Sequence, residues 1–310
     1  MEPLGVRQTK PEAPETQPEA EAARAPGAPV WRRTPLDAGL HVVATPIGNL
    51  RDVSLRALDT LASAAVIACE DTRMTGRLLA AYGIRTTLTP YHDHNAAAAR
   101  PKLLARLAAG EAVALVSDAG TPLVSDPGYK LVRAVLEAGH RVIPVPGASA
   151  LLAGLVSAGL PTDRVTFAGF LPAKAGARER ALRDLAGHQA TLVFYESGPR
   201  LAASLAAMAG VLGDREAAVA RELTKLHEEV RRGTLADLAA HYAEAGPPKG
   251  EIVVVVGPPG ETEAPDAESL DARLAELVPN LGVKGAARQI AAETGMPMRD
   301  LYARALALPR

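Results

Sequence analysis

Cysteine and aromatic residues are scarce in this chain. Its 310 residues include one cysteine, Cys69, which excludes an internal disulfide framework and a cysteine-based zinc cluster. Aromatic residues make up only 3% of the chain, so stacking on aromatic side chains is not expected to be its main means of binding nucleic acid. No apolar run reaches the roughly 18 residues that a membrane-spanning helix needs.

Neither sign of charge is in excess. The chain has 34 Lys and Arg against 35 Asp and Glu, a balance that argues against a protein that coats nucleic acid but still allows local basic patches. Residues 1–37 are rich in proline, glutamate and alanine and have no apolar segment typical of a secretory signal. We therefore expect a disordered tail at 1–37, or residues upstream of the true start, and a cytoplasmic protein.

From residue 38 to 160, short apolar strands alternate with helical segments. This alternation predicts an α/β domain with a mainly parallel sheet covered on both faces. Gly83, Gly110 and Gly139 are expected to end helices in the left-handed conformation. The expected strands are 40–45, 65–69, 86–89, 112–117 and 141–145, with helices that start near Ser54, Thr72, Asn95 and Gly128 and after Ala148.

A second α/β domain is expected at 161–258, followed by a linker and a small helical domain at 259–310. Two strands of the second domain have little chain between them, which predicts a mixed sheet. Its expected strands are 164–169, 191–195, 217–221, 228–232 and 252–256, and its helices 178–185, 200–209 and 235–245. Three helices are expected near the end of the chain, at 266–277, 282–293 and 297–307.

In an open α/β sheet, ligands bind at the carboxyl ends of the strands, so the loops there are the candidate site. The loop 44–50 contains Gly48, which would allow close approach of the backbone to a ligand, although a simple Pro-Gly turn also explains it. The loops 117–128 and 144–150 are rich in small residues, and their backbone is suited to a zwitterionic, adenine-bearing ligand. Asp126 and Pro127 are expected to begin a helix. Nothing matches a dinucleotide or ATP motif.

Charged residues follow the second strand and the third. Glu70 and Asp71 suit the orientation of a polar substrate or acceptance of a proton, whereas Asp71 also fits a helix N-cap. His92 and His94 favour a structural or RNA-positioning role over a metal site, because no further ligands accompany them. Asn95 is expected to cap a helix.

In the second domain, one basic and acidic segment is ambiguous. Arg221, Glu222 and Lys225 form either a surface ion-pair cluster or a cleft wall that faces phosphates.

Nine stretches occur in the order of a known family. They are VATPIGNLRDVSLRAL, CEDTRMTGRLL, YHDHN, LVSDAGTPLVSDPGY, VPGASA, FAGFLP, FYESGPR, RELTKLHEE and GEIVVVVG. Together they resemble the tetrapyrrole-methylase superfamily, and more closely its ribosomal small subunit methyltransferase I branch. The resemblance implies a homodimer of two-domain α/β chains with S-adenosylmethionine in a trough between the domains. It also implies 2′-O-methylation of a cytidine in the decoding centre of 16S rRNA, within the small ribosomal subunit.

The resemblance further implies which residues hold the cofactor. On matching positions they are Pro46, Ile47, Gly48, Gly120, Thr121, Pro122, Val124, Ser125, Ser149, Ala150, Phe170, Leu171, Gly250 and Glu251. Candidates for catalysis or substrate positioning are Glu70, Asp71, Arg73, His92, His94 and Lys225. Glu70 or Asp71 is expected near the ribose hydroxyl, and Arg73 and Lys225 near phosphates. No metal is expected.

Two other functions compete with this one. A tetrapyrrole C-methyltransferase would share fold and cofactor, but EDTR, RELTK and the C-terminal helices fit the RNA branch better. A cofactor-free RNA-binding module would not need five strand-end loops that contain glycine or proline. Contact with RNA is expected at local basic patches, although a solvated helix face remains the default explanation for either patch taken singly. These patches are Lys174, Arg178, Arg180 and Arg183, and near the C-terminus Lys284, Arg288, Arg299, Arg304 and Arg310.

Overall fold

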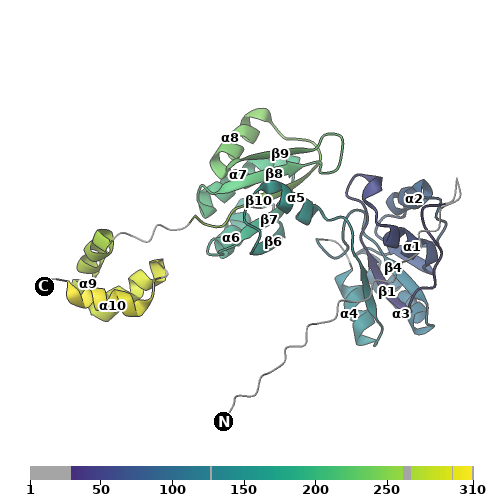
Figure 1. The fold of residues 1–310 in the computed structure, drawn as a ribbon, viewed down its shortest axis with the longest axis horizontal. Coiled ribbons are helices and arrows are strands. Elements are labelled where there is room, and N and C mark those ends of the chain that lie inside the picture. Colours follow the sequence, from purple (N-terminus) through teal and green to yellow (C-terminus); the bar gives the residue numbers. More distant parts are fainter. Residues whose placement is uncertain (1–28, 126–127, 261–266, 295, 309–310) are drawn as a thin grey trace, which may run out of the picture.

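The computed structural model describes residues 29–125, 128–260, 267–294 and 296–308. Two α/β domains lie side by side, and the C-terminal helices are set apart from both (Figure 1). Asp126 and Pro127, expected to begin a helix, fall outside the described residues, as do most residues of the predicted tail. None of the described helices is both long and apolar enough to cross a membrane.

The first domain is built on a parallel five-stranded sheet in the order β3-β2-β4-β1-β5, which confirms the expected architecture. Its strands are β1 (Gly39–Val43), β2 (Val66–Cys69), β3 (Leu88–Pro90), β4 (Ala112–Leu115) and β5 (Val142–Val145). The connecting helices are η1 (Leu50–Asp52), α1 (Leu55–Ser63), α2 (Thr72–Ala81), α3 (Ala96–Ala108) and α4 (Tyr129–Glu137).

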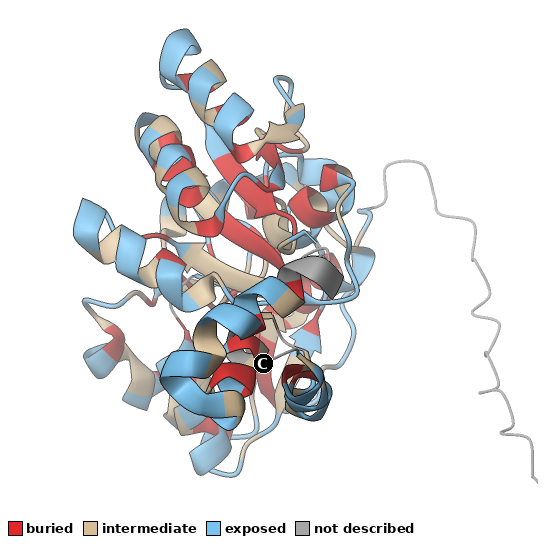
Figure 2. Ribbon diagram, turned by 90° about the vertical axis from the view of Figure 1, so that its left-hand side faces the viewer, coloured by how far each residue is buried: buried red, intermediate tan, exposed pale blue. Residues whose placement is uncertain are grey.

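Alternating strand residues fill two separate cores in this domain. Ile67 packs with α1 and α2, whereas its neighbours Val66 and Ala68 pack with α3 and α4, because successive side chains of a strand point to opposite faces. Buried residues follow the strands and the inner faces of the helices (Figure 2). The predicted left-handed glycines Gly83 and Gly110 have φ of 66° and 80°, as expected at helix ends.

Residues 29–37 correct part of the predicted tail. Trp31 packs against the first core, and its indole Nε1 donates a hydrogen bond of 2.6 Å to the carbonyl of Tyr82. The backbone amide of Thr34 donates to Ser63 Oγ at 3.0 Å. These contacts hold the segment on the domain surface. The composition of the segment did not indicate them, because they depend on the packing of one large apolar side chain, Trp31.

The second domain has a mixed sheet in the order β6-β7-β10-β8-β9, and only β6 and β7 pair in parallel. A mixed sheet was the expectation. Its strands are β6 (Val165–Phe170), β7 (Thr191–Ser197), β8 (Glu216–Arg221), β9 (Glu229–Thr234) and β10 (Glu251–Val256). One face is covered by α6 (Ala175–Leu185), α7 (Gly198–Leu212) and α8 (Leu235–Ala245).

The other face of this sheet is covered by α5 (Ala150–Ala158), which was expected to belong to the first domain. Leu155 and Ala158 pack against residues of β7, β8 and β10. A Cβ added at Gly154 would lie 2.7 Å from Val253 Cγ1, so the helix lies close on the strand. By packing, the boundary between the two sheets therefore falls before α5. Ile47 of the first domain joins the same core, which ties the two domains together.

The C-terminal helices form a third small core. α9 (Ala267–Thr294) is interrupted at Gly282, whose φ of 67° and ψ of 164° are not helical, so it consists of two helices that meet at a kink, as expected. α10 (Met298–Ala307) packs against it through Leu301 and Ala305. Arg304 holds Asp271 across the two helices at 2.6 Å.

Candidate functional site

A cavity of about 440 Å³ lies where the carboxyl ends of the first sheet meet the second domain. This volume is within the range of small-molecule sites. From the first domain it is lined by Ile47, Glu70, Asp118, Ala119, Gly120, Thr121, Val124, Ser125, Ser149 and Ala150. From the second it is lined by Phe170, Tyr195, Glu196, Ser197, Leu223, Gly250, Glu251, Ile252 and Val253.

Hydrogen bonds hold three loops of the first domain together at this cavity. The amides and carbonyls of Thr45 and Gly120 exchange two bonds of 2.8 and 3.0 Å. Thr121 Oγ1 donates to the carbonyl of Ala148 at 3.2 Å, which joins the loops after β4 and β5. Gly120 has a φ of 76°, and a Cβ there would lie 3.3 Å from Ile47 Cγ2. The loops therefore present backbone rather than bulky side chains to a ligand.

The loop after β4 has an unusual backbone. Leu123 and Ser125 have positive φ angles of 73° and 64°, which side chains other than glycine and a few polar ones rarely adopt. Ser125 lines the cavity. Strain of this kind persists only where the surrounding structure holds it, and it is concentrated at ligand sites.

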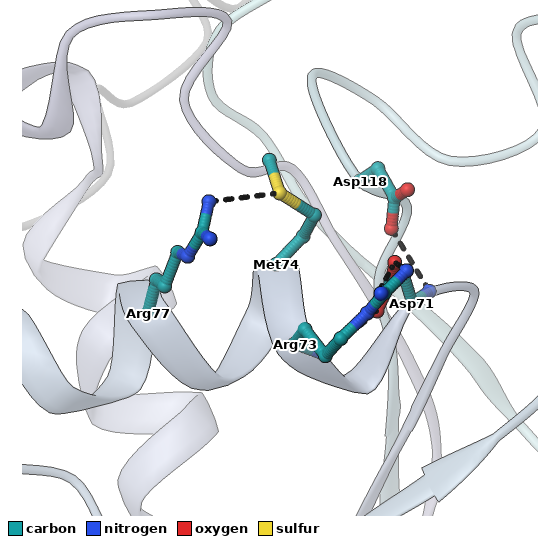
Figure 3. A network of polar contacts seen from close by, with 5 residues as sticks. All are labelled: Asp71, Arg73, Met74, Arg77 and Asp118. Atoms are coloured by element: carbon teal, nitrogen blue, oxygen red, sulfur yellow. Dashed lines mark hydrogen bonds and ion pairs between the residues drawn. The ribbon is translucent and has the colours of Figure 1, made fainter.

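The loop after β2 brings two carboxylates with opposite pKa shifts to one end of the site. Burial raises the pKa of Glu70, and the charges of Asp118 and Asp93 raise it further. The hydrogen bonds from Arg73 lower the pKa of Asp71 to about 2. Asp71 caps α2 by accepting from the amide of Arg73 at 2.8 Å, and its own amide donates to Asp118 Oδ1 at 3.0 Å (Figure 3).

Lys225 lies against Gly48, outside the cavity lining. Its Nζ lies 2.8 Å from Glu222 Oε1 and 2.7 Å from Glu251 Oε2, and a Cβ added at Gly48 would lie 2.4 Å from Lys225 Cγ. Burial lowers the pKa of Lys225, but the hydrogen bonds with both glutamates outweigh it, and the net shift is upward. Lys225 therefore stays charged and is unsuited to act as a base.

The second domain contributes a buried carboxylate that sequence reasoning did not select. Glu196 is 3% exposed, and its Oε2 accepts a hydrogen bond of 2.5 Å from Ser204 Oγ. Its Oε1 accepts from the amide of Ser197 at 2.8 Å and lies 3.4 Å from Arg200 Nε. These partners compensate the buried charge and fix this wall of the cavity.

Comparisons with known proteins agree with this architecture. The Tetrapyrrole (Corrin/Porphyrin) Methylases family matches residues 39–239. A second family, described as the RsmI C-terminal HTH domain, matches residues 263–309. The chain is 54% identical to Ribosomal RNA small subunit methyltransferase I of Mesorhizobium japonicum, over 88% of this chain and 93% of the relative.

The protein of the same name from Erythrobacter litoralis is 55% identical, over 88% of this chain and 96% of the relative. The chain belongs to the tetrapyrrole methylase family, in the branch of the ribosomal RNA small subunit methyltransferase I proteins.

Solved structures share the fold of this family member at low sequence identity. The methyltransferase CobJ is 20% identical, with a TM-score of 0.54 over 71% of this chain and 94% of its own. A cobalt precorrin-4 methyltransferase is 19% identical, with a TM-score of 0.53 over 70% of this chain and 94% of its own.

The cavity includes most, but not all, of the residues that the family resemblance singled out. Ten of these fourteen residues line it: Ile47, Gly120, Thr121, Val124, Ser125, Ser149, Ala150, Phe170, Gly250 and Glu251. Of the charged candidates, Glu70 lines it as well. The residues that do not line it are Pro46, Gly48, Pro122 and Leu171, and, among the charged candidates, Asp71, Arg73, His92, His94 and Lys225. Leu171, the residue after β6, instead belongs to the core under α6 and α7.

Several charged candidates have structural roles in the fold. Asp71 caps α2 and pairs with Arg73, whose side chain is 85% exposed. Lys225 belongs to an ion-pair cluster, as one of the two interpretations expected, but Arg221 pairs with Glu229 at 3.1 Å instead of Glu222. Asn95 begins α3 without a side-chain cap, since its Oδ1 accepts from the amide of His92.

Eight residues of the cavity lining were not predicted as site residues, and the sequence indicates them to different degrees. They are Asp118, Ala119, Tyr195, Glu196, Ser197, Leu223, Ile252 and Val253. Glu196 and Ser197 follow the predicted strand 191–195. The same position after a strand identified the other candidate loops, so it could have identified these two residues as well. Leu223, Ile252 and Val253 read as core residues in sequence, and only the docking of the domains brings them to the cavity. The described residues contain no group of His, Cys, Asp and Glu able to hold a metal ion.

Proposed function

We propose that this chain transfers a methyl group from S-adenosylmethionine to the 2′-oxygen of a cytidine ribose in the decoding centre of 16S rRNA. The relatives named ribosomal RNA small subunit methyltransferase I, which match it over most of both chains, support an rRNA substrate. The observation that carries the proposal is the single cavity between the two domains, lined by backbone from three adjacent strand-end loops. Work on ribosomal RNA also fits a cytoplasmic location.

The residues around the cavity fit S-adenosylmethionine. Its volume of about 440 Å³ suits a ligand of that size. Buried Ile47, Leu223 and Val253 supply apolar walls for the adenine. Polar groups of Thr121, Ser149 and the backbone around Gly250 supply partners for the ribose and the methionine part of the cofactor. The other residues on the family's matching positions complete this proposed set.

The protein has two tasks in this reaction: it aligns the ribose oxygen with the methyl group, and it supplies a group that accepts the hydroxyl proton. Bound S-adenosylmethionine supplies a methyl group on a sulfonium, a good leaving group that departs as a neutral thioether. Holding the ribose oxygen in line with that methyl group is worth roughly 7–11 kcal/mol. Glu70 lines the cavity and its pKa is raised, which makes it the best-placed group to accept the hydroxyl proton. Asp71 is committed to Arg73 and to the helix cap.

Methyl incorporation from labelled S-adenosylmethionine tests the proposal. Incubation with 30S subunits, naked 16S rRNA and a uroporphyrinogen should label only an RNA substrate, at the ribose of one cytidine. Labelling of the tetrapyrrole alone would support the competing tetrapyrrole C-methyltransferase. The C-terminal helices favour RNA, because they match the domain described for the RNA branch.

A homodimer is part of the same proposal. Leu152 and Val156 lie one turn apart on α5 and are 56% and 75% exposed, so they form an apolar strip that a second copy would cover. Sedimentation of Val156→Asp should show a shift toward the monomer if α5 lies in the interface. An unchanged dimer would place the interface elsewhere.

A further inference from the structure

One aromatic ring stands open in the cavity of a chain that has few aromatic residues. Phe170 ends β6, lines the cavity and is 57% exposed. The chain has three phenylalanines; Phe194 is fully buried, and Phe167 is half-buried. A phenylalanine exposed to this extent at a ligand cavity indicates a surface that a ligand covers.

The ring of Phe170 is held in place by its neighbours. Tyr195 meets it edge to face, with centroids 5.6 Å apart and an interplanar angle of 64°. Tyr195 is fixed in turn by Phe167, 4.9 Å away at 67°. The hydroxyl of Tyr195 accepts a hydrogen bond of 3.2 Å from the amide of Leu151, at the start of α5. The cavity therefore has a rigid aromatic wall with an accessible face.

The cavity offers two different surfaces to two ligands. The walls formed by Ile47, Leu223 and Val253 are at most 9% exposed, and they suit a cofactor that is largely enclosed. Phe170, by contrast, lies on the exposed part of the lining. A ligand that enters after the cofactor would meet this ring first.

Basic residues follow Phe170 along the chain. Lys174 precedes α6, and Arg178 and Arg180 lie in its first turns. Lys174 and Arg180 are exposed, and in the described part of the chain neither forms an ion pair. Exposed basic residues that follow an open aromatic ring along the chain are typical of proteins that bind single-stranded nucleic acid, with bases stacked on rings and phosphates on basic side chains.

We propose that Phe170 stacks on the nucleobase of the nucleotide whose ribose is methylated. This inference rests on the proposed function, and it assigns Phe170 to the substrate rather than to the cofactor set implied by the family resemblance. Glu70 lines the same cavity, so a base stacked on Phe170 and the proton acceptor belong to one site. Since every base has a π-face, Phe170 positions the nucleotide and does not select cytidine.

Substitutions of Phe170 distinguish its assignment to the substrate base from its assignment to the cofactor. Phe170→Leu removes the ring but keeps an apolar side chain, and Phe170→Trp keeps a stacking face. For Phe170→Leu we expect kcat/KM on 30S subunits to fall by roughly 5- to 150-fold, the range for loss of one base stack. Its dissociation constant for S-adenosylmethionine, measured by calorimetry, should stay within about twofold of wild type, and Phe170→Trp should retain most of the activity.

Leu136→Ala is the matched control, because Leu136 is 55% exposed on α4 and does not line the cavity. Its kcat/KM should equal that of wild type. Weakened cofactor binding in Phe170→Leu, in proportion to the lost activity, would overturn the inference and return Phe170 to the adenine. So would unchanged kcat/KM, or a loss of dimer on sedimentation, which would show that a second copy covers the ring. A wild-type chain that labels neither 30S subunits nor naked 16S rRNA would overturn the proposed function itself.

Discussion

Glu70 and Asp71 are adjacent in the chain, yet the fold gives their carboxyl groups opposite properties. Glu70 ends in the cavity, where burial and the charges of Asp118 and Asp93 raise its pKa. Asp71 faces Arg73 and the first turn of α2, and its pKa falls to about 2. Two carboxylates with separated pKa values are a common basis for distinct chemical roles. At this site the separation points to Glu70 as the proton acceptor.

The pH dependence of kcat/KM should reveal Glu70. A base must be deprotonated, so activity should fall as pH decreases through the raised pKa of Glu70, with a midpoint above the ordinary value of 4.5. Glu70→Gln should lower kcat by about 10²–10⁴-fold and abolish this acid limb. Asp93→Asn removes a like charge, so it should move the limb to lower pH and keep kcat. A limb that persists in Glu70→Gln would exclude this role.

At the scale of single elements, α7 holds two glycines in contrasting surroundings. A Cβ at Gly198 would lie 1.8 Å from the carbonyl oxygen of Pro248, in the loop that leads to Gly250 in the cavity lining. A Cβ at Gly210 would meet nothing within 4 Å. The first turn of the helix therefore lies directly against this loop, whereas the helix surface at Gly210 is open.

Alanine at these two positions should have opposite effects on the free energy of unfolding. Gly198→Ala forces the backbone of the loop to move, and we expect loss of stability by about 1–3 kcal/mol or more, together with weaker cofactor binding. Gly210→Ala should stabilise by roughly 0.5–1 kcal/mol, because alanine loses less conformational freedom in a helix. Urea unfolding measures both. Equal effects in the two variants would contradict the packing of α7 on this loop.

Contact between the loop after β1 and the segment after β8 is a second element-scale feature. Gly48→Ala places a methyl group against the stem of Lys225, which two glutamates hold in position. We expect the free energy of unfolding, measured in urea, to fall by about 1–3 kcal/mol, the cost of overpacking. In a Lys225→Ala background the same change should have little effect. Equal effects in both backgrounds would show that the two residues are not coupled.

For the whole molecule, net charge is nearly balanced, so RNA must be bound by local groups. In the C-terminal helices, Arg304 is held by Asp271, and Arg299 lies 3.6 Å from Asp300. Lys284 and Arg288 are exposed, lie one turn apart on α9, and have no ion pair in the part of the chain that the structure describes. Of the predicted basic residues in the C-terminal helices that the structure describes, these two are the most available to phosphates.

Removal of both charges should weaken binding of 30S subunits. For Lys284→Ala/Arg288→Ala we expect a higher KM and a shallower dependence of binding on salt, by about one unit of slope for each phosphate that is no longer neutralised. Affinity for S-adenosylmethionine should not change, because the helices have a core of their own. Arg133→Ala, which removes a charge paired with Glu137, serves as the control. An unchanged salt slope would place the RNA on another face.

Local patterns predicted the elements well and their partners less well. The strand β10 was expected at 252–256 and is observed at Glu251–Val256, and α8 has the predicted bounds Leu235–Ala245. Apolar periodicity and glycine punctuation act over a few residues, so one sequence reveals them. In contrast, α5 carries apolar residues all round, and such a pattern does not indicate which of two sheets it covers.

The sequence by itself determined two α/β units, a helical extension and a set of small-residue loops at strand ends, because each depends on neighbours along the chain. Only the tertiary structure decided that Glu196, Leu223 and Tyr195 face those loops, and that Asp71 and Lys225 are held in ion pairs. The physical reason is that burial and ion pairing depend on which residues are close in the folded structure, not on which are close along the chain. The packing of Ile47 in the core of the second domain creates the cavity, and local propensity carries no information about that contact.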